Sequence, residues 1–368
     1  MTRSRLEKLI ASIRTRDLDA VILNPGPTLK YLSGLNFHLM ERPVVLFVAP
    51  GKDPVLVLPE LELPKVDLFP YKVQAISYGE IPSEWDDAFR KAAQVLGLAG
   101  KRIGVEPRQL RLMEFRYVKA GAPEADYPDG SDVFADLRLR KDKAEVDAMR
   151  TAVKIAQDAL EATIPQIKIG MTEKEVASEL VVQLLKHGSE SEMPFAPIVS
   201  AGPNSANPHA SPSDRKLQAG DLLVVDWGAA YDGYISDLTR TFAVGEVDEE
   251  CQKIHKIVQE SNAAGRAAAM PGVPCANVDK AAREVIEKSG YGKYFTHRTG
   301  HGIGMEGHEA PYMRGDNMQI LEPGMAFTVE PGIYLTNRNG VRIEDNLVIT
   351  ENGADCLSDM PREIQVVG

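Results

Sequence analysis

Two stretches that lie 104 residues apart carry the same pattern. Residues 217–228 read LQAGDLLVVDWG and residues 321–332 read LEPGMAFTVEPG, with Leu, Gly, Val, an acid and Gly at identical spacings. In each copy an apolar run ends at the acid, and turn residues followed by a second run predict a hairpin. The chain must therefore fold into a body that contains two related hairpins.

The first hairpin presents two aspartates on one face. Its outgoing strand ends at Asp226, Asp232-Gly233 supplies a two-residue turn, and the return strand carries Asp237. This turn places Asp226 opposite Thr239, so the two aspartates are diagonal neighbours with Cβ atoms roughly 7 Å apart. Carboxylates this close repel, so either one holds a proton or a cation lies between them.

The second hairpin repeats the arrangement with glutamates. Glu330 ends the first strand, and a loop containing Asn339-Gly340 leads to a return strand with Glu344. With about five residues in that loop, Glu344 would face Gly332. One hairpin alone could carry surface acids beside a turn, but two matched pairs favour a shared site.

The repeat extends upstream, which predicts two copies of a helix, helix, hairpin unit over residues 150–350. Such halves would pack about a pseudo-twofold axis where four carboxylates meet. The matched positions are Gly170 and Gly272, Val176 and Val278, and Gly188 and Gly290.

The region before residue 135 has a different pattern. Strand-length apolar runs, among them 20–23, 43–49 and 54–58, alternate with helical segments. This alternation predicts a small α/β domain over residues 1–135. Residues 136–368 are then an α+β domain that contains the internal duplication.

Composition excludes several classes of function. A net charge of −11 argues against a nucleic-acid or anionic-membrane surface, and no apolar run approaches a membrane span. The first twenty residues read as an amphipathic helix, with no signal peptide. The three cysteines lack CxxC spacing and are interpreted as free thiols. We therefore expect a cytoplasmic protein.

Histidines supply the nitrogen ligands. Residues 296–311 read THRTGHGIGMEGHEAP, and the glycines favour an extended segment over a helix. There His301 is a candidate ligand, His308 a candidate acid or base, and His297 a supporting residue. His209 lies in the Pro- and Ser-rich loop 193–213, just before the first hairpin, and is a candidate substrate contact. The alternative is a glycine-rich loop with surface histidines.

Four carboxylates and one imidazole carry too much negative charge for one small cation. Two divalent ions would neutralise them, polarise a carbonyl and activate water, as amide hydrolysis requires. Oxygen ligands with some nitrogen and no thiolate favour Mn²⁺, with Co²⁺, Zn²⁺ or Fe²⁺ as alternatives.

These residues resemble the prolidase, aminopeptidase P and methionine aminopeptidase group with the pita-bread fold. The resemblance rests on VVDWGAAYDGYISDLTRT, HRTGHGIGMEGHEAP, LEPGMAFTVEPGIY and GVRIEDNLVIT, and on YLSG in the first domain. It implies an α/β creatinase-like N-terminal domain (1–135) and an α+β pita-bread catalytic metallopeptidase domain with an internal pseudo-twofold duplication (136–368). It also implies a homodimer.

The resemblance assigns roles to individual residues. Glu330 would be the proton shuttle as well as a metal ligand. His308 and His209 would contact substrate at the scissile bond, and His297 matches a further active-site histidine. Arg342 resembles an arginine that orients the acidic cluster. The implied metal ligands are Asp226, Asp237, His301, Glu330 and Glu344.

The implied reaction removes an N-terminal residue that precedes proline. Prolidases often read the dipeptide's carboxylate with an arginine four residues after the histidine matching His308, and here that position holds Tyr312, with Arg314 two further on. We therefore expect an Xaa-Pro aminopeptidase, with an Xaa-Pro dipeptidase, in which Arg314 reads the carboxylate, as the alternative. A non-catalytic peptide-binding module is a remote alternative, because such modules lose ligands.

Overall fold

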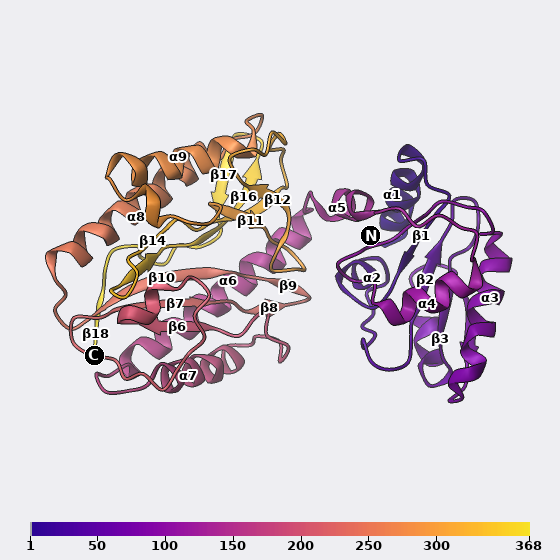
Figure 1. Ribbon diagram of the computed structural model, residues 1–368, viewed down its shortest axis with the longest axis horizontal. Helices are drawn as coiled ribbons and strands as arrows, with labels where there is room; N and C mark the ends of the chain where they lie inside the picture. Colours follow the sequence, from indigo (N-terminus) through magenta and orange to yellow (C-terminus); the bar gives the residue numbers. More distant parts are fainter. Residues whose placement is uncertain (1) are drawn as a thin grey trace. The chain divides into compact units, whose positions relative to one another are not determined.

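The computed structural model describes residues 2–368, and the chain divides into two units, Met1–Arg138 and Leu139–Gly368 (Figure 1). The first unit has one five-stranded sheet in the order β4-β3-β2-β1-β5. Strands β1, β2 and β3 are antiparallel neighbours, whereas β4 and β5 join in parallel. The strands are β1 (Ala20–Leu23), β2 (Val45–Val48), β3 (Val55–Pro59), β4 (Gln74–Tyr78) and β5 (Ile103–Gly104).

Helices pack against this sheet because its central strands are apolar throughout. Strands β1 to β3 are fully buried, and Phe89 of α3 and Val118 of α4 pack on the sheet residues Ile22 and Phe47. The α/β class and the hairpin at 43–58 are as predicted. The helices are α1 (Thr2–Thr15), α2 (Pro27–Ser33), α3 (Trp85–Leu96), α4 (Leu112–Gly121) and α5 (Ser131–Arg138).

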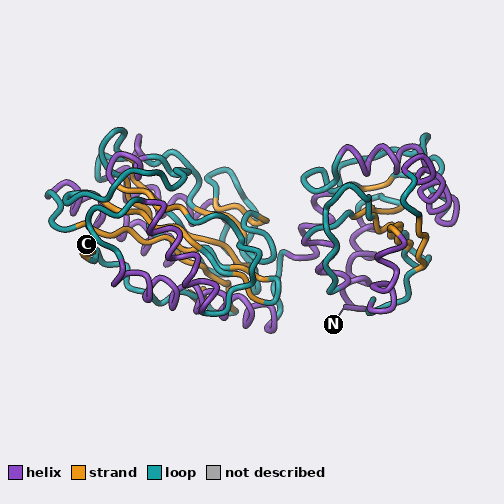
Figure 2. Tube along the Cα trace, turned by 90° about the horizontal axis from the view of Figure 1, so that it is seen from below, coloured by secondary structure: helices purple, strands orange, loops and turns teal. Residues whose placement is uncertain are grey.

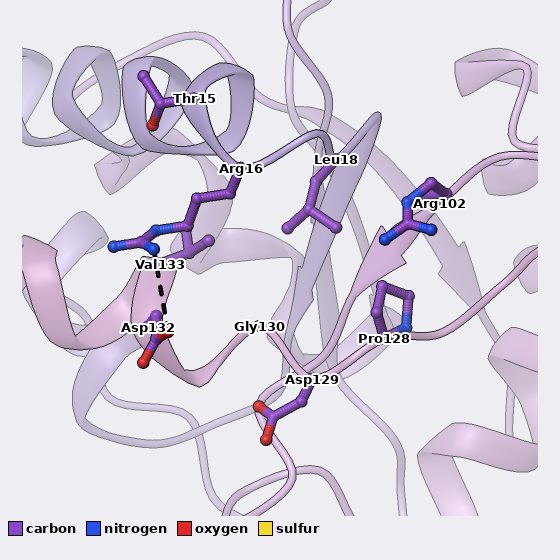
Figure 3. Close-up of a pocket in the computed structure, with 9 residues that line it drawn as sticks. All are labelled: Thr15, Arg16, Leu18, Arg102, Pro128, Asp129, Gly130, Asp132 and Val133. Atoms are coloured by element: carbon purple, nitrogen blue, oxygen red, sulfur yellow. Dashed lines mark ion pairs between the residues drawn. The ribbon is translucent and has the colours of Figure 1, made fainter.

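One cavity of about 360 Å³ opens in the first unit (Figure 3). Arg16 and Arg102 line it together with Asp129 and Asp132, and Arg16 pairs with Asp132 at 3.9 Å. Its charges are therefore of both signs, and its lining holds none of the residues predicted for the site.

Four long helices in the second unit reproduce the predicted repeat. Glycines matched between the halves have left-handed backbones at equivalent places: φ is 92° at Gly170 and 85° at Gly272 before the second helix of each half, and 102° at Gly188 and 84° at Gly290 after it. Thr172 caps its helix through the predicted capping box. The helices are α6 (Lys143–Thr163), α7 (Glu173–Lys186), α8 (Glu249–Ala268) and α9 (Cys275–Lys288).

Among the described residues, no helix has the length and apolar character needed to cross a membrane.

The strands of this unit form two principal sheets, ordered β18-β10-β7-β6 and β12-β11-β13-β16-β17, with two-stranded ribbons β8-β9 and β14-β15. Figure 1 shows α6 and α7 on one side of the strands and α8 and α9 on the other, and Figure 2 shows the strands running between helices. The strands are β6 (Ile198–Ala201), β7 (Leu222–Trp227), β8 (Ala230–Tyr231), β9 (Tyr234–Ile235), β10 (Leu238–Val244), β11 (Gly300–Gly302), β12 (Glu309–Met313), β13 (Ala326–Val329), β14 (Gly332–Tyr334), β15 (Gly340–Arg342), β16 (Asp345–Thr350), β17 (Gly353–Cys356) and β18 (Val366–Val367).

The first hairpin has the predicted register. Thr239 pairs with Asp226, and Asp232 and Gly233 have φ of 50° and 77°, as a two-residue turn with two left-handed positions requires. Strand β6, however, lies inside the segment 193–213 that was expected to be a loop. Its four residues are flanked by Pro and Gly, and pairing with β7 gives them a strand that their composition does not indicate.

The predicted register of the second hairpin is wrong by two residues. Gly332 pairs with Arg342, and the pairing of Val329 with Asp345 continues the same register, so Glu344 lies across from Glu330. The error came from the assumed length of the loop. The hydrogen bond from Leu335 N to Asn339 O closes the loop around residues 336–338, so the loop is shorter than expected and lies nearer the start of the hairpin.

A buried ion network fixes the strand that follows Glu344. Asp345 is fully buried and accepts hydrogen bonds from Arg240 Nη2 (2.9 Å) and Arg362 Nε (2.7 Å). Arg240 also donates to the backbone oxygen of Glu344 (2.7 Å). Burial by itself would raise the pKa of Asp345, but the two guanidinium groups lower it, to about 2.

An Asp345→Asn variant should lose about 2–3 kcal/mol of unfolding free energy at pH 7, because the buried Arg240 and the partly buried Arg362 lose their charged partner. A carboxylate with a lowered pKa stabilises the fold above its unfolded pKa of about 3.9. The difference between variant and wild type should therefore shrink as the pH falls from about 4 towards 2. Denaturant titrations in a chelator would measure both effects. The control is Asp355→Asn, whose ion pair with Arg150 is half-exposed and should matter by less than about 1 kcal/mol; equal losses in the two variants would contradict the network's role.

Candidate active site

A backbone bridge between Thr239 and Glu344 joins the two hairpins and brings their acids together. Glu344 N donates to Thr239 O (3.1 Å), and the Thr239 hydroxyl donates to Glu344 Oε2 (2.7 Å). Ligand atoms of Asp237, His301 and Glu344 all lie within 4.8 Å of one another. Asp226 lies on the same face as Asp237, by the register of the first hairpin.

His301 reaches this cluster from β11, with its Nε2 atom 3.4 Å from Glu330 Oε1 and 3.7 Å from Asp237 Oδ2. Its Nδ1 lies 3.2 Å from the carbonyl oxygen of Gly302, which can only accept, so Nδ1 carries the proton. Burial, helped by the charge of His308, lowers the pKa of His301 well below its usual value. The Nε2 lone pair therefore points at carboxylates.

Glycine is required beside His301 because the backbones approach closely there. A Cβ atom at Gly300 would lie 1.9 Å from Thr328 O, and one at Gly302 would lie 2.2 Å from Ala310 O. The extended, glycine-permitted segment expected from the sequence is therefore what the structure has.

The carboxylates disturb one another's protonation. Burial, reinforced by neighbouring carboxylates, raises the pKa of Asp237 and of Glu344 well above the ordinary values. Burial also raises the pKa of Asp226, although Arg342 opposes the shift. For Glu330, burial raises the pKa to about 8. The buried carboxylates therefore cannot all be ionised at low cost unless positive charge is added to the cluster.

Arg342 hydrogen-bonds to the acidic cluster. Its Nη2 donates to Asp226 Oδ2 (2.6 Å) and its Nε to Thr239 Oγ1 (3.1 Å). Its Nη1 donates to the Tyr334 hydroxyl (3.1 Å), which lies 2.8 Å from His297 Nε2. His297 Nδ1 lies 2.7 Å from a carbonyl oxygen and carries the proton, so Tyr334 donates to Nε2. Burial lowers the pKa of His297 to about 4, which keeps the ring neutral.

Three other predicted residues are exposed, and one of them is not brought to the cluster. His308 is exposed, with its ring centroid 4.0 Å from that of His301. His209 is exposed as well, and it is a minor influence that opposes the burial-raised pKa of Asp226. Arg314 is not brought to the cluster: its side chain is 59% exposed and pairs with Asp316. The structure therefore gives no support to Arg314 as a substrate contact.

Some residues that shape the site were missed from the sequence. Asn346 holds the backbone of Asp237 through both its amide atoms (3.0 and 2.5 Å), and Asn262 of α8 donates to Val329 O, beside Glu330. Thr239 was placed opposite Asp226 by the register alone, so its role could have been found. Nothing in the local pattern marks Tyr334 or the two asparagines.

The cluster suits divalent cations. Within residues 2–368, two buried carboxylate oxygens, Asp226 Oδ1 and Glu344 Oε1, have no hydrogen-bond partner. The His301 lone pair faces carboxylates of Asp237 and Glu330. Cations would satisfy all three and cancel the repulsion that raises the pKa values. Oxygen and imidazole donors without thiolates are a ligand set for such ions.

Comparison with known proteins agrees with this geometry. Residues 147–351 match the model of metallopeptidase family M24, and residues 5–140 match the creatinase/prolidase N-terminal domain. The chain belongs to metallopeptidase family M24. These matches confirm the expected creatinase-like domain, the pita-bread domain and the use of a divalent metal.

The relatives of this M24 metallopeptidase cover its whole length. A Mycobacterium tuberculosis protein named probable dipeptidase PepE is 37% identical over 370 residues, 99% of this chain and 96% of the relative. The prolidase structure from Thermococcus sibiricus has a TM-score of 0.94 and 33% identity, covering 100% and 99% of the two chains. An X-Pro aminopeptidase structure from Thermotoga maritima has a TM-score of 0.85 and 31% identity, covering 98% and 99%.

Added Mn²⁺ should raise the melting temperature of the metal-free protein, and more at pH 8 than at pH 6. Carboxylates with raised pKa values bind protons more tightly in the folded chain, so metal-free stability falls as the pH rises towards 8, while the cation competes with fewer protons. The gain is about 2.7 kcal/mol at a hundredfold excess over Kd. A Glu344→Gln variant should lose most of the shift, whereas Glu351→Gln, at an exposed turn, should keep it. A shift that ignores pH and persists in Glu344→Gln would contradict the site.

Proposed function

We propose that the protein is an Xaa-Pro dipeptidase that uses two divalent ions, with Mn²⁺ as the preferred metal. The observation that carries the proposal is the buried cluster with two unpartnered carboxylate oxygens. The proposed ligands are Asp226, Asp237, His301, Glu330 and Glu344.

The relatives support a dipeptidase better than the aminopeptidase that the sequence predicts. Full-length relatives are named dipeptidase and prolidase, and the prolidase has the higher TM-score of the two X-Pro enzymes compared above. The aminopeptidase expectation rested on Tyr312 replacing an arginine. One position is weak evidence, because a carboxylate can be read by a cation from a neighbouring segment.

The chain's own residues supply proton transfer and orientation. When bound, the two ions would polarise the scissile carbonyl and lower the pKa of water. One carboxylate oxygen of Glu330 would take a proton from the attacking water and then deliver it to the prolyl nitrogen. A prolyl amide nitrogen has no hydrogen, so it needs this proton to leave. His308 and His209, which are both exposed, would contact the substrate around the bond.

The Mn²⁺-loaded protein should release methionine from Met-Pro with a kcat/KM roughly tenfold or more above that for Met-Pro-Ala, since a site built around a charged group discriminates against its absence. Free methionine can be measured by chromatography, and Met-Ala controls for the need for proline. Faster cleavage of Met-Pro-Ala would show that the protein is an aminopeptidase. Cleavage of neither peptide by metal-loaded protein would favour the binding-module alternative.

A Glu330→Gln variant saturated with Mn²⁺ should lose roughly 10²–10⁴-fold in kcat, the range for loss of a general acid or base. Glu322→Gln, at an exposed position in the same repeat, should retain wild-type turnover. Wild-type kcat in Glu330→Gln would remove this residue from proton transfer.

A further inference from the structure

A dipeptide differs from a longer peptide by a carboxylate next to the scissile bond. One residue spans roughly 3.3–3.6 Å, so a cation that reads this carboxylate must lie beside the acidic cluster. An aminopeptidase needs no such cation. The proposed dipeptidase function therefore requires a cationic side chain at this place, and Arg314 is not that side chain.

Arg298 lies at this place. It precedes β11, and its guanidinium carbon is 4.7 Å from the centroid of the Tyr312 ring. Tyr312 of β12 pairs with His301 of β11. The side chains of a directly paired couple lie on one face of the sheet. The residue that follows Arg298 bonds to the backbone of the cluster, because Glu330 N donates to Thr299 O (2.7 Å).

The other cations near the cluster have acceptors. Arg342 donates to Asp226, Thr239, Tyr334 and the Pro208 carbonyl, and Lys141 Nζ lies 2.5 Å from Glu309 Oε1. Arg283 binds Asp279. By contrast, no acceptor among residues 2–368 binds the guanidinium of Arg298, which is half-buried. A guanidinium over a ring face keeps its N–H edge available for a two-pronged bond to a carboxylate.

The backbone on both sides of Arg298 is fixed. His297 O accepts from Arg283 Nη2 (2.8 Å), and Thr299 N donates to Asp279 Oδ1 (3.0 Å), so α9 holds this segment. An arginine on a fixed backbone that is stacked on an aromatic ring loses little entropy when it binds a carboxylate.

We propose that Arg298, stacked on Tyr312, binds the terminal carboxylate of the dipeptide substrate and so makes the site specific for dipeptides. The proposal rests on the dipeptidase function proposed above. Prolidases often carry the reading arginine at the position of Tyr312 on β12. In this chain the arginine would come from the segment before β11 and stack on the Tyr312 ring.

The test compares Met-Pro with Met-Pro amide, which has the same scissile bond and no terminal carboxylate. Wild-type protein with Mn²⁺ should prefer Met-Pro. Arg298→Met should lower kcat/KM for Met-Pro by roughly 10- to 100-fold, mainly through KM, and leave the amide unchanged. Arg314→Met, which removes an exposed arginine, should retain the wild-type preference.

Two further measurements separate substrate reading from a structural role. The melting temperature and its Mn²⁺ shift should be unaltered in Arg298→Met. Calorimetry should show that L-proline binds wild-type protein more tightly than prolinamide, and that Arg298→Met removes the difference. If Arg298→Met does not fold, Arg298→Lys is the second variant, and it should keep part of the preference because it keeps the charge but not the two-pronged bond.

The outcomes are distinguishable. If wild-type protein cleaves neither substrate, the proposed function fails and this inference fails with it. If wild-type protein prefers Met-Pro and folded Arg298→Met keeps that preference, the dipeptidase function stands and only the role of Arg298 is overturned.

Discussion

Mutual repulsion among buried carboxylates is the constraint on which the rest of the catalytic unit depends. Burial and neighbouring charges raise the pKa values of Asp237 and Glu344, and Arg342 alone cannot offset the charge of the cluster. Around it, Thr239, Asn346 and Asn262 fix the acids or the backbone that carries them. These polar contacts hold the acids in place against a force that would separate them, which is the condition for rapid cation binding without rearrangement.

The repeat made much of this arrangement readable in advance. Identical spacings predicted both hairpins, and the Asp232-Gly233 turn set the first register correctly because a two-residue turn leaves no freedom. The second register failed because a longer loop can close at several places. Local pattern also could not reveal Tyr334 or Asn262, because their roles depend on segments that meet only in the folded chain.

The choice between dipeptides and longer peptides also could not be predicted from local sequence pattern. Reading the position of Tyr312 in isolation suggested that a carboxylate reader was missing, and that suggestion favoured an aminopeptidase. In the fold, Tyr312 supports an arginine that is 14 residues away in the sequence. Under the proposal made above, a charge from another segment would take the place of an arginine at position 312.

The division of the ligands between the two halves has a mechanical consequence. Asp226 and Asp237 belong to one hairpin and Glu330 and Glu344 to the other. The two backbones bridge at Thr239 and Glu344, and Arg342 also bonds across to Asp226. A bound ion would therefore act as a crosslink that closes a loop of about a hundred residues, as a long-range disulfide does. Metal supply would then govern how long the folded enzyme survives proteolysis, as well as whether it is active.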